Sequence, residues 1–207
     1  MWDLQVTGLP VATEDGFIVA DLSHGYIARS LGLTLRWLPF GSAKGSTFTV
    51  LDEKEVSTLV DDELPPSAVG PRAAALAERT RRRVAEANER VMGKPFHPVV
   101  VCATSMTERD AFCEEPQTIR CRTLTATLQG DTLAWHGEDG EGKRTLGIAK
   151  KPMQITEGPK TPILSCVRSA YYDPSAKSLA LKIEYGCKGG GGDACSMDGP
   201  WRVVPLR

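Results

Sequence analysis

The spacing of hydrophobic residues follows a helical period in one stretch of the chain and a strand period on either side of it. Within residues 71–92 small or apolar residues recur every three or four positions, which places them on one face of a helix. They are Leu76, Thr80, Val84, Ala87 and Val91. Pro71 suits a first helical turn, and Gly93 suits the left-handed position at which many helices end. The pattern predicts one long helix, and its narrow stripe favours packing on a sheet.

Before this helix, short apolar or alternating runs predict a β-meander with a polar outer face. The predicted strands span residues 17–22, 33–37 and 47–51. Asp52 followed three residues later by Glu55 resembles a capping box, in which each side chain bonds to the other residue's backbone N–H. It predicts a short helix over residues 53–59.

After the helix, the clearest pattern is a hairpin around Gly130-Asp131, a pair that fits a two-residue turn. In that register Leu128 faces Leu133 and Ala126 faces Trp135, so the apolar faces match. The alternation changes parity within residues 119–128, which we interpret as one strand with a β-bulge near Thr123. The remaining predicted elements are a charged turn at 138–143, a weak strand at 145–149, a hairpin of 164–172 with 178–185, and a last strand at 201–206.

These elements predict an α+β protein, mostly antiparallel β meanders with the long helix packed on a sheet. Three regions follow from the distribution of cysteine and the position of the helix, either as separate subdomains or as one continuous domain. They are a cysteine-free β-rich region (1–66), the long helix (67–94) and a cysteine-containing β-rich region (95–207). Trp37, Trp135 and Trp201 each fall on the apolar side of an alternating strand, which favours the core over a carbohydrate platform.

Composition narrows the class of protein only slightly. The 207 residues are 41% hydrophobic and 25% charged, and the formal net charge is −1. A net charge so close to zero predicts no particular class of partner. No apolar run approaches the roughly 20 residues of a membrane span. The opening MWDLQVTGLP lacks the basic and apolar regions of a signal peptide. We therefore expect either a mature exported chain or a cytoplasmic one.

The cysteines favour export. All six lie in the second half of the chain, and none forms the close pairs typical of metal sites. They are Cys102, Cys113, Cys121, Cys166, Cys187 and Cys195. An even number in one region is typical of a disulfide framework in an exported protein. We expect Cys187 and Cys195 to bond across the glycine-rich segment between them. The alternative is six buried thiols in a cytosolic protein.

The helix carries arginine on the face opposite its apolar stripe, and Arg79, Arg82 and Arg83 form a candidate interaction surface. A solvated face with internal ion pairs is the simpler interpretation, because Glu78 precedes Arg82 by four residues and Glu86 precedes Arg90 by four. No aromatic residue is interleaved to stack bases. We therefore expect no binding to nucleic acid.

No pattern in the chain predicts catalysis, a metal or a cofactor. Asp21, Ser23 and His24 lie too close in sequence for a typical triad, which is assembled from separate segments. The glycine run near residue 190 lacks the lysine and the following helix of a phosphate loop.

Two segments carry a resemblance. ATEDGFIVADL resembles the turn and strand that open a propeller-like blade. SAYYDPSAKSLALKIEYGC followed by WRVVPL resembles the C-terminal end of uncharacterised exported bacterial β-rich proteins. The resemblance implies a β-meander, an alanine- and arginine-rich helix and a cysteine-bearing β half, and it implies no activity.

We therefore expect an exported binding or interaction module, periplasmic or secreted, that is stabilised by disulfides and has no catalytic activity or cofactor. Its partner would be a protein or an extracellular ligand. One alternative is an exported hydrolase that uses His24 or carboxylates in a cleft. The other is a cytoplasmic regulator whose arginine-rich helix face meets an acidic partner.

Overall fold

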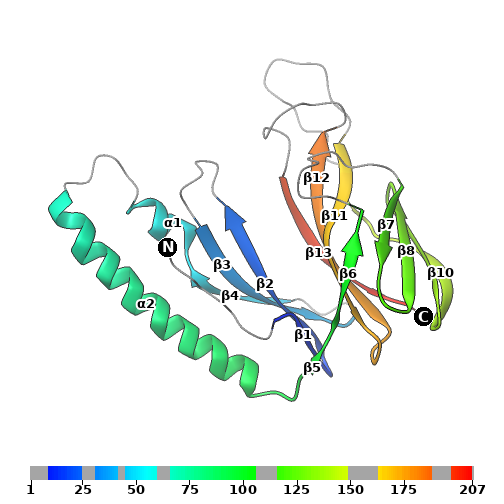
Figure 1. Ribbon diagram of the computed structural model, residues 1–207, viewed down its shortest axis with the longest axis horizontal. Helices are drawn as coiled ribbons and strands as arrows, with labels where there is room; N and C mark the ends of the chain where they lie inside the picture. The colour runs from blue at the N-terminus through cyan, green and yellow to red at the C-terminus, as the bar shows by residue number, and fades with distance from the viewer. Residues whose placement is uncertain are drawn as a thin grey trace. The chain divides into compact units, whose positions relative to one another are not determined.

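The structure, a computed structural model, divides into two compact units, Met1–Pro98 and Val99–Arg207. It describes residues 9–24, 31–41, 45–59, 66–105, 116–148, 163–187 and 197–206. Each unit contains one antiparallel sheet, and the long helix belongs to the first unit (Figure 1). The predicted fold class, mostly antiparallel β with one long helix, is confirmed.

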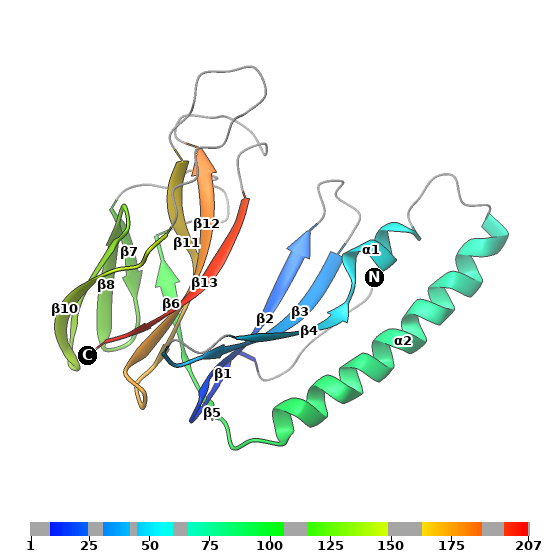
Figure 2. The ribbon, with the colours of Figure 1, turned by 180° about the vertical axis from the view of Figure 1, so that it is seen from behind.

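The first unit is a five-stranded sheet in the order β4-β3-β2-β1-β5, with α2 lying along one face (Figure 2). Its strands are β1 (Val11–Thr13), β2 (Gly16–His24), β3 (Leu31–Pro39), β4 (Ser46–Leu51) and β5 (His97–Pro98). Its helices are α1 (Glu53–Ser57) and α2 (Pro66–Met92). The three strands predicted in this region are confirmed as β2, β3 and β4.

The long helix begins earlier than its sequence pattern indicates. Its first residue is Pro66, so Pro71 lies inside the helix and the predicted start there is wrong. Gly70 immediately precedes Pro71, and its missing side chain avoids the clash that disfavours a helical residue before proline. At the other end Gly93 donates to the Glu89 carbonyl at 3.0 Å without a positive φ, so the predicted left-handed stop is also wrong.

The apolar stripe of α2 packs as predicted. Leu76, Thr80 and Ala87 are buried, and the neighbouring valines of the stripe are partly buried. They contact a core formed by the facing strands, in which Leu33 and Leu35 are almost fully buried. Burying side chains of this size contributes about 2 kcal/mol each, so packing holds the helix more than its intrinsic propensity does.

The second unit is an eight-stranded sheet in the order β10-β9-β8-β7-β6-β11-β12-β13, which curls into a half-barrel (Figure 1). Its first strands are β6 (Val100–Thr104), β7 (Gln117–Arg120), β8 (Leu124–Gln129), β9 (Thr132–Gly137) and β10 (Gly140–Thr145). The chain then adds β11 (Ile163–Asp173), β12 (Ser178–Cys187) and β13 (Met197–Pro205). The predicted hairpin of residues 164–172 with 178–185 is confirmed as β11 and β12.

The hairpin of β8 and β9 has the register that the sequence predicts. Leu128 lies opposite Leu133 and Ala126 opposite Trp135. Gly130 takes a φ of 59°, which a two-residue turn of this kind requires and which glycine adopts without strain. All four paired side chains are buried in the core of the unit.

Two neighbouring predictions are wrong. Residues 119–128 are not one bulged strand, because the chain reverses after Arg120 and β7 pairs with β8. The Cys121 N–H donates to the Leu124 carbonyl at 2.8 Å and closes this turn. The predicted charged turn at 138–143 is mostly strand β10, which replaces the weak strand predicted at 145–149. Alternation could not indicate β10, because its glycine and charged residues carry no apolar period.

A buried side chain joins the two halves of this sheet. Strand β6 pairs with β7 at only two positions, Ala103 with Arg120 and Thr104 with Ile119. Beyond them, the Gln117 side chain of β7 accepts a hydrogen bond of 2.6 Å from the Val167 N–H of β11, at a bulge in that strand. Gln117 thereby satisfies a backbone donor that the strand ladder leaves unpaired.

Candidate functional site

A disulfide joins β6 to the turn between β7 and β8. Cys102 and Cys121 are bonded, with their Cα atoms 4.3 Å apart and a sequence separation of 19. Cys166 in β11 is disulfide-bonded as well. Cys113, Cys195 and the side chain of Cys187 lie outside the described residues, so the Cys187–Cys195 bond stays a prediction.

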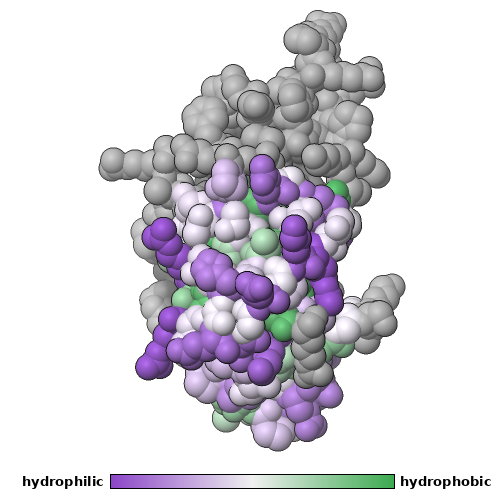
Figure 3. All heavy atoms as spheres, turned by 90° about the vertical axis from the view of Figure 1, so that its right-hand side faces the viewer, coloured by the Kyte–Doolittle hydropathy of each residue, from purple (hydrophilic) through white to green (hydrophobic). Residues whose placement is uncertain are grey.

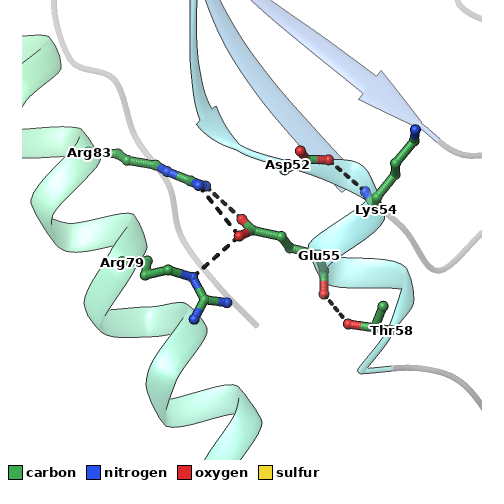
Figure 4. Close-up of polar contacts among 6 residues, drawn as sticks. All are labelled: Asp52, Lys54, Glu55, Thr58, Arg79 and Arg83. Carbon is green, nitrogen blue, oxygen red and sulfur yellow. Dashed lines mark hydrogen bonds and ion pairs between the residues drawn. The ribbon is translucent and has the colours of Figure 1, made fainter.

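The arginines of α2 meet a carboxylate of α1 (Figure 4). Arg83 donates to both oxygens of Glu55, at 2.6 and 3.4 Å, and the Arg79 Nε lies 3.3 Å from Glu55 Oε1. Asp52 caps α1 by accepting from the Lys54 N–H at 2.9 Å. The predicted capping box is therefore only half formed, because Glu55 points to α2 instead of back to Asp52.

The remaining arginines form local pairs on the surface of α2. Glu86 pairs with Arg90 as predicted, and the Arg90 guanidinium also lies 4.3 Å from the centre of the Phe48 ring. Glu78 pairs with Arg81 at 2.5 Å and not with Arg82, which the sequence indicated. Arg82 is exposed. The structure thus does not bring Arg79, Arg82 and Arg83 together as one exposed surface.

Replacing Glu55 with glutamine is expected to lower the free energy of unfolding by about 1 kcal/mol, because two guanidinium groups lose one shared, partly buried carboxylate. Urea denaturation followed by tryptophan fluorescence measures the change. Glu78→Gln is the matched control, since its pair with Arg81 is exposed, and we expect it to change stability by less than about 0.5 kcal/mol. Equal effects of the two substitutions would show that Glu55 does not fasten α1 to α2.

The other candidate groups of the sequence do not converge on a catalytic arrangement within the described ranges. Asp21 pairs with Arg36 across β2 and β3 at 2.6 Å, and the His24 side chain is outside the described part. Asp139 accepts from the fully buried Tyr172 hydroxyl and lies 3.2 Å from the Lys177 ammonium. The ion pair of Asp139 with Lys177 connects the turn between β9 and β10 to the turn between β11 and β12. Within these ranges, no cluster of three or more His, Cys, Asp or Glu side chains is placed to hold a metal.

A hollow of about 200 Å³ opens at one end of the first sheet. Its rim carries the exposed pair of Asp15 and Lys94, whose atoms are 3.1 Å apart. Trp37 and Phe17 contribute to its wall. The hollow is smaller than the roughly 300–1,000 Å³ of most small-molecule sites, and its two charges neutralise each other. It defines no ligand class.

The outer face of β6, β11, β12 and β13 is the more informative surface. Residues that lie opposite each other in neighbouring strands share a face. Leu179, Leu181 and Ile183 point into the core, so Ala180 and Lys182 point to the opposite face of the sheet, where both are also buried. The register places a row of partly apolar side chains beside them, which we call the aromatic face: Val101, Tyr171, Lys182, Trp201 and Val203.

The aromatic face has a defined internal order. The Tyr171 and Trp201 rings stack with centres 5.8 Å apart and an angle of 20°. The Lys182 ammonium lies 5.9 Å from the centre of the Trp201 ring. Val101 is 67% exposed in the middle of the sheet, which is unusual for a valine in a strand. Stacked aromatic rings beside an exposed apolar side chain are typical of binding surfaces.

Trp201 corrects the sequence analysis, and Tyr171 was missed by it. Trp135 is buried as predicted and Trp37 is partly buried, but Trp201 lies on the outer face of β13. A usable signal existed for Tyr171. Tyr171 and Tyr172 are adjacent in one strand, so they point to opposite faces and one of them had to lie outside the core.

The side of the molecule seen in Figure 3 is mostly hydrophilic where the structure describes it, with a few hydrophobic residues among the polar ones. Scattered apolar residues are ordinary on protein surfaces and indicate no site.

Comparison with known proteins identifies no relative: no protein-family model, no curated protein sequence and no solved structure matches the chain. Among the helices of the described residues, none is long and apolar enough to cross a membrane.

Proposed function

We propose that the protein is an exported binding module whose second unit is stabilised by disulfides and presents the aromatic face to its ligand. The Cys102–Cys121 bond carries this proposal, since structural disulfides persist in oxidising compartments and are rare in the cytosol. A second bonded cysteine, Cys166, supports it.

The site chemistry favours binding over turnover. The carboxylates of Asp21 and Asp139 are engaged in contacts within the protein, with Arg36 in one case and with Tyr172 and Lys177 in the other. On the aromatic face Val101 is exposed and Tyr171, Trp201 and Val203 are half-buried. Large, rigid aromatic side chains of this kind contribute most to binding energy.

Intact mass measurement tests the disulfide premise. The chain is produced once in a reducing cytosol and once in an oxidising compartment, and each sample is alkylated under denaturing conditions with and without prior reduction. We expect the oxidised sample to take up no label before reduction and six labels after it, one for each cysteine. Peptide mapping should recover Cys102 linked to Cys121. Labelling of either residue in the unreduced oxidised sample would overturn the proposal.

A further inference from the structure

The last strand of the second sheet, β13, is an edge strand that pairs only with β12 among the described strands. Just beyond its end, the Leu206 N–H donates to the Lys177 carbonyl at 2.8 Å, which fixes the hydrogen-bonding phase of the ladder. In an antiparallel pair, hydrogen-bonded and non-bonded residues alternate. Arg202 and Val204 therefore bond to β12, and the N–H and C=O groups of Trp201 and Val203 point away from it.

Two further observations agree with this phase. The Arg202 side chain donates to the Trp201 carbonyl at 3.3 Å, which it reaches because that carbonyl faces the open side. Pro205 has no N–H and lies opposite Ser178 at a non-bonded position, where none is needed. The open part of the edge is thus short, with Trp201 and Val203 as its backbone donors.

The two edges of this sheet differ in their side chains. At the other edge, β10 carries exposed Glu141, Lys143 and Arg144, and such charges discourage pairing with another strand. The open part of β13 instead carries Trp201 and Val203 on the aromatic face and one charge, Arg202, on the opposite face. An extended peptide that adds to a sheet edge gains affinity from backbone hydrogen bonds and specificity from alternate side chains.

The charge of Arg202 determines which kind of strand can add favourably to the β13 edge. If the β13 strands of two copies of this chain paired antiparallel through Trp201 and Val203, the Arg202 side chains of the two copies would lie directly opposite each other. Like charges placed in this way are destabilising. A partner strand with an acidic residue opposite Arg202 makes a favourable pair instead. Apolar residues on either side of that acidic residue would lie beside Trp201 and Val203.

We propose that the β13 edge binds an extended segment of a partner protein in which an acidic residue lies between two apolar residues. This inference rests on the proposed binding function and names the class of ligand. The added segment becomes a ninth strand of the sheet, and its two apolar side chains extend the aromatic face beside Trp201 and Val203.

The test uses two capped, fluorescently labelled peptides, Thr-Val-Asp-Val-Thr and Thr-Val-Lys-Val-Thr, with the oxidised full chain. Anisotropy measures affinity, and amide chemical shifts locate the contact. We expect the acidic peptide to bind roughly tenfold more tightly than the lysine peptide and to shift the Trp201 and Val203 amides. Arg202→Glu should reverse the preference.

Backbone pairing is tested by Val203→Pro, which removes one open N–H without removing a bond to β12. We expect a roughly tenfold loss of affinity for the acidic peptide, whereas Val203→Thr, which keeps the N–H, should bind within about twofold of the parent. Circular dichroism checks the fold of each variant. If Val203→Pro does not fold, the Arg202→Glu reversal decides alone.

Three results would overturn the inference. They are no shift at the Trp201 or Val203 amides at about 1 mM acidic peptide, equal affinity of the two peptides, and self-association that Val203→Pro abolishes. The third would make a second copy the occupant. Each leaves the labelling result for Cys102 and Cys121 untouched, so failure of this inference is distinguishable from failure of the proposed function.

Discussion

Replacing Cys102 and Cys121 together with alanine is expected to lower the free energy of unfolding by about 3 kcal/mol. The bond closes a segment with a sequence separation of 19, and a cross-link of that length restricts the unfolded chain by about this amount. Urea denaturation of the parent and the double variant, both purified from an oxidising compartment, measures the difference. The slope against urea should also rise in the variant, because its unfolded chain exposes more surface.

Val101→Ala is the matched control for the disulfide. It alters the residue beside Cys102 but removes only an exposed side chain, so we expect a change within about 0.5 kcal/mol. A loss below about 1 kcal/mol in the double alanine variant would show that strand pairing alone holds β6 against the β7–β8 turn.

Gly142→Ala is expected to destabilise the second unit by about 2 kcal/mol. A Cβ atom at Gly142 would lie 2.5 Å from the Trp135 ring, closer than real carbon contacts allow. Trp135 lies opposite Gly142 in the neighbouring strand and is buried, so the ring has to leave its place in the core. Thermal unfolding and the near-ultraviolet circular dichroism of tryptophan should both change.

A double-mutant cycle isolates this contact. In a Trp135→Leu background the smaller side chain leaves room, so Gly142→Ala should cost roughly 1 kcal/mol less than in the parent. Lys143→Ala, an exposed position on the same strand, is expected to change stability by less than about 0.5 kcal/mol. An unchanged cost in the Trp135→Leu background would place the strain in the backbone of β10.

Local pattern was sufficient where the period, the turn and the pairing agreed. The β8–β9 hairpin was predictable to the residue because Gly130-Asp131 fixes its register and Leu128 and Leu133 confirm it. The change of parity near Thr123 was ambiguous, since a bulge and a chain reversal produce the same sequence pattern. Residues 121–123 contain no glycine, proline, asparagine or aspartate to indicate a turn.

The candidate site was less predictable because it depends on contacts between distant residues. Glu55 and Arg83 are 28 positions apart, and no local rule pairs them. Trp201 was assigned to the core because its alternation shows two faces without showing which one is covered. Only its register with Lys182 in β12 places Trp201 on the outer face.

The way in which β6 joins the second sheet also bears on how that unit assembles. Its hairpins connect strands that are neighbours in sequence, such as β8 with β9 and β11 with β12, and such local pairings form quickly. The pairing of Cys102 with Ala170 instead closes a long loop, which costs more chain entropy before any contact repays it. The half-barrel therefore combines fast local steps with one slow long-range closure.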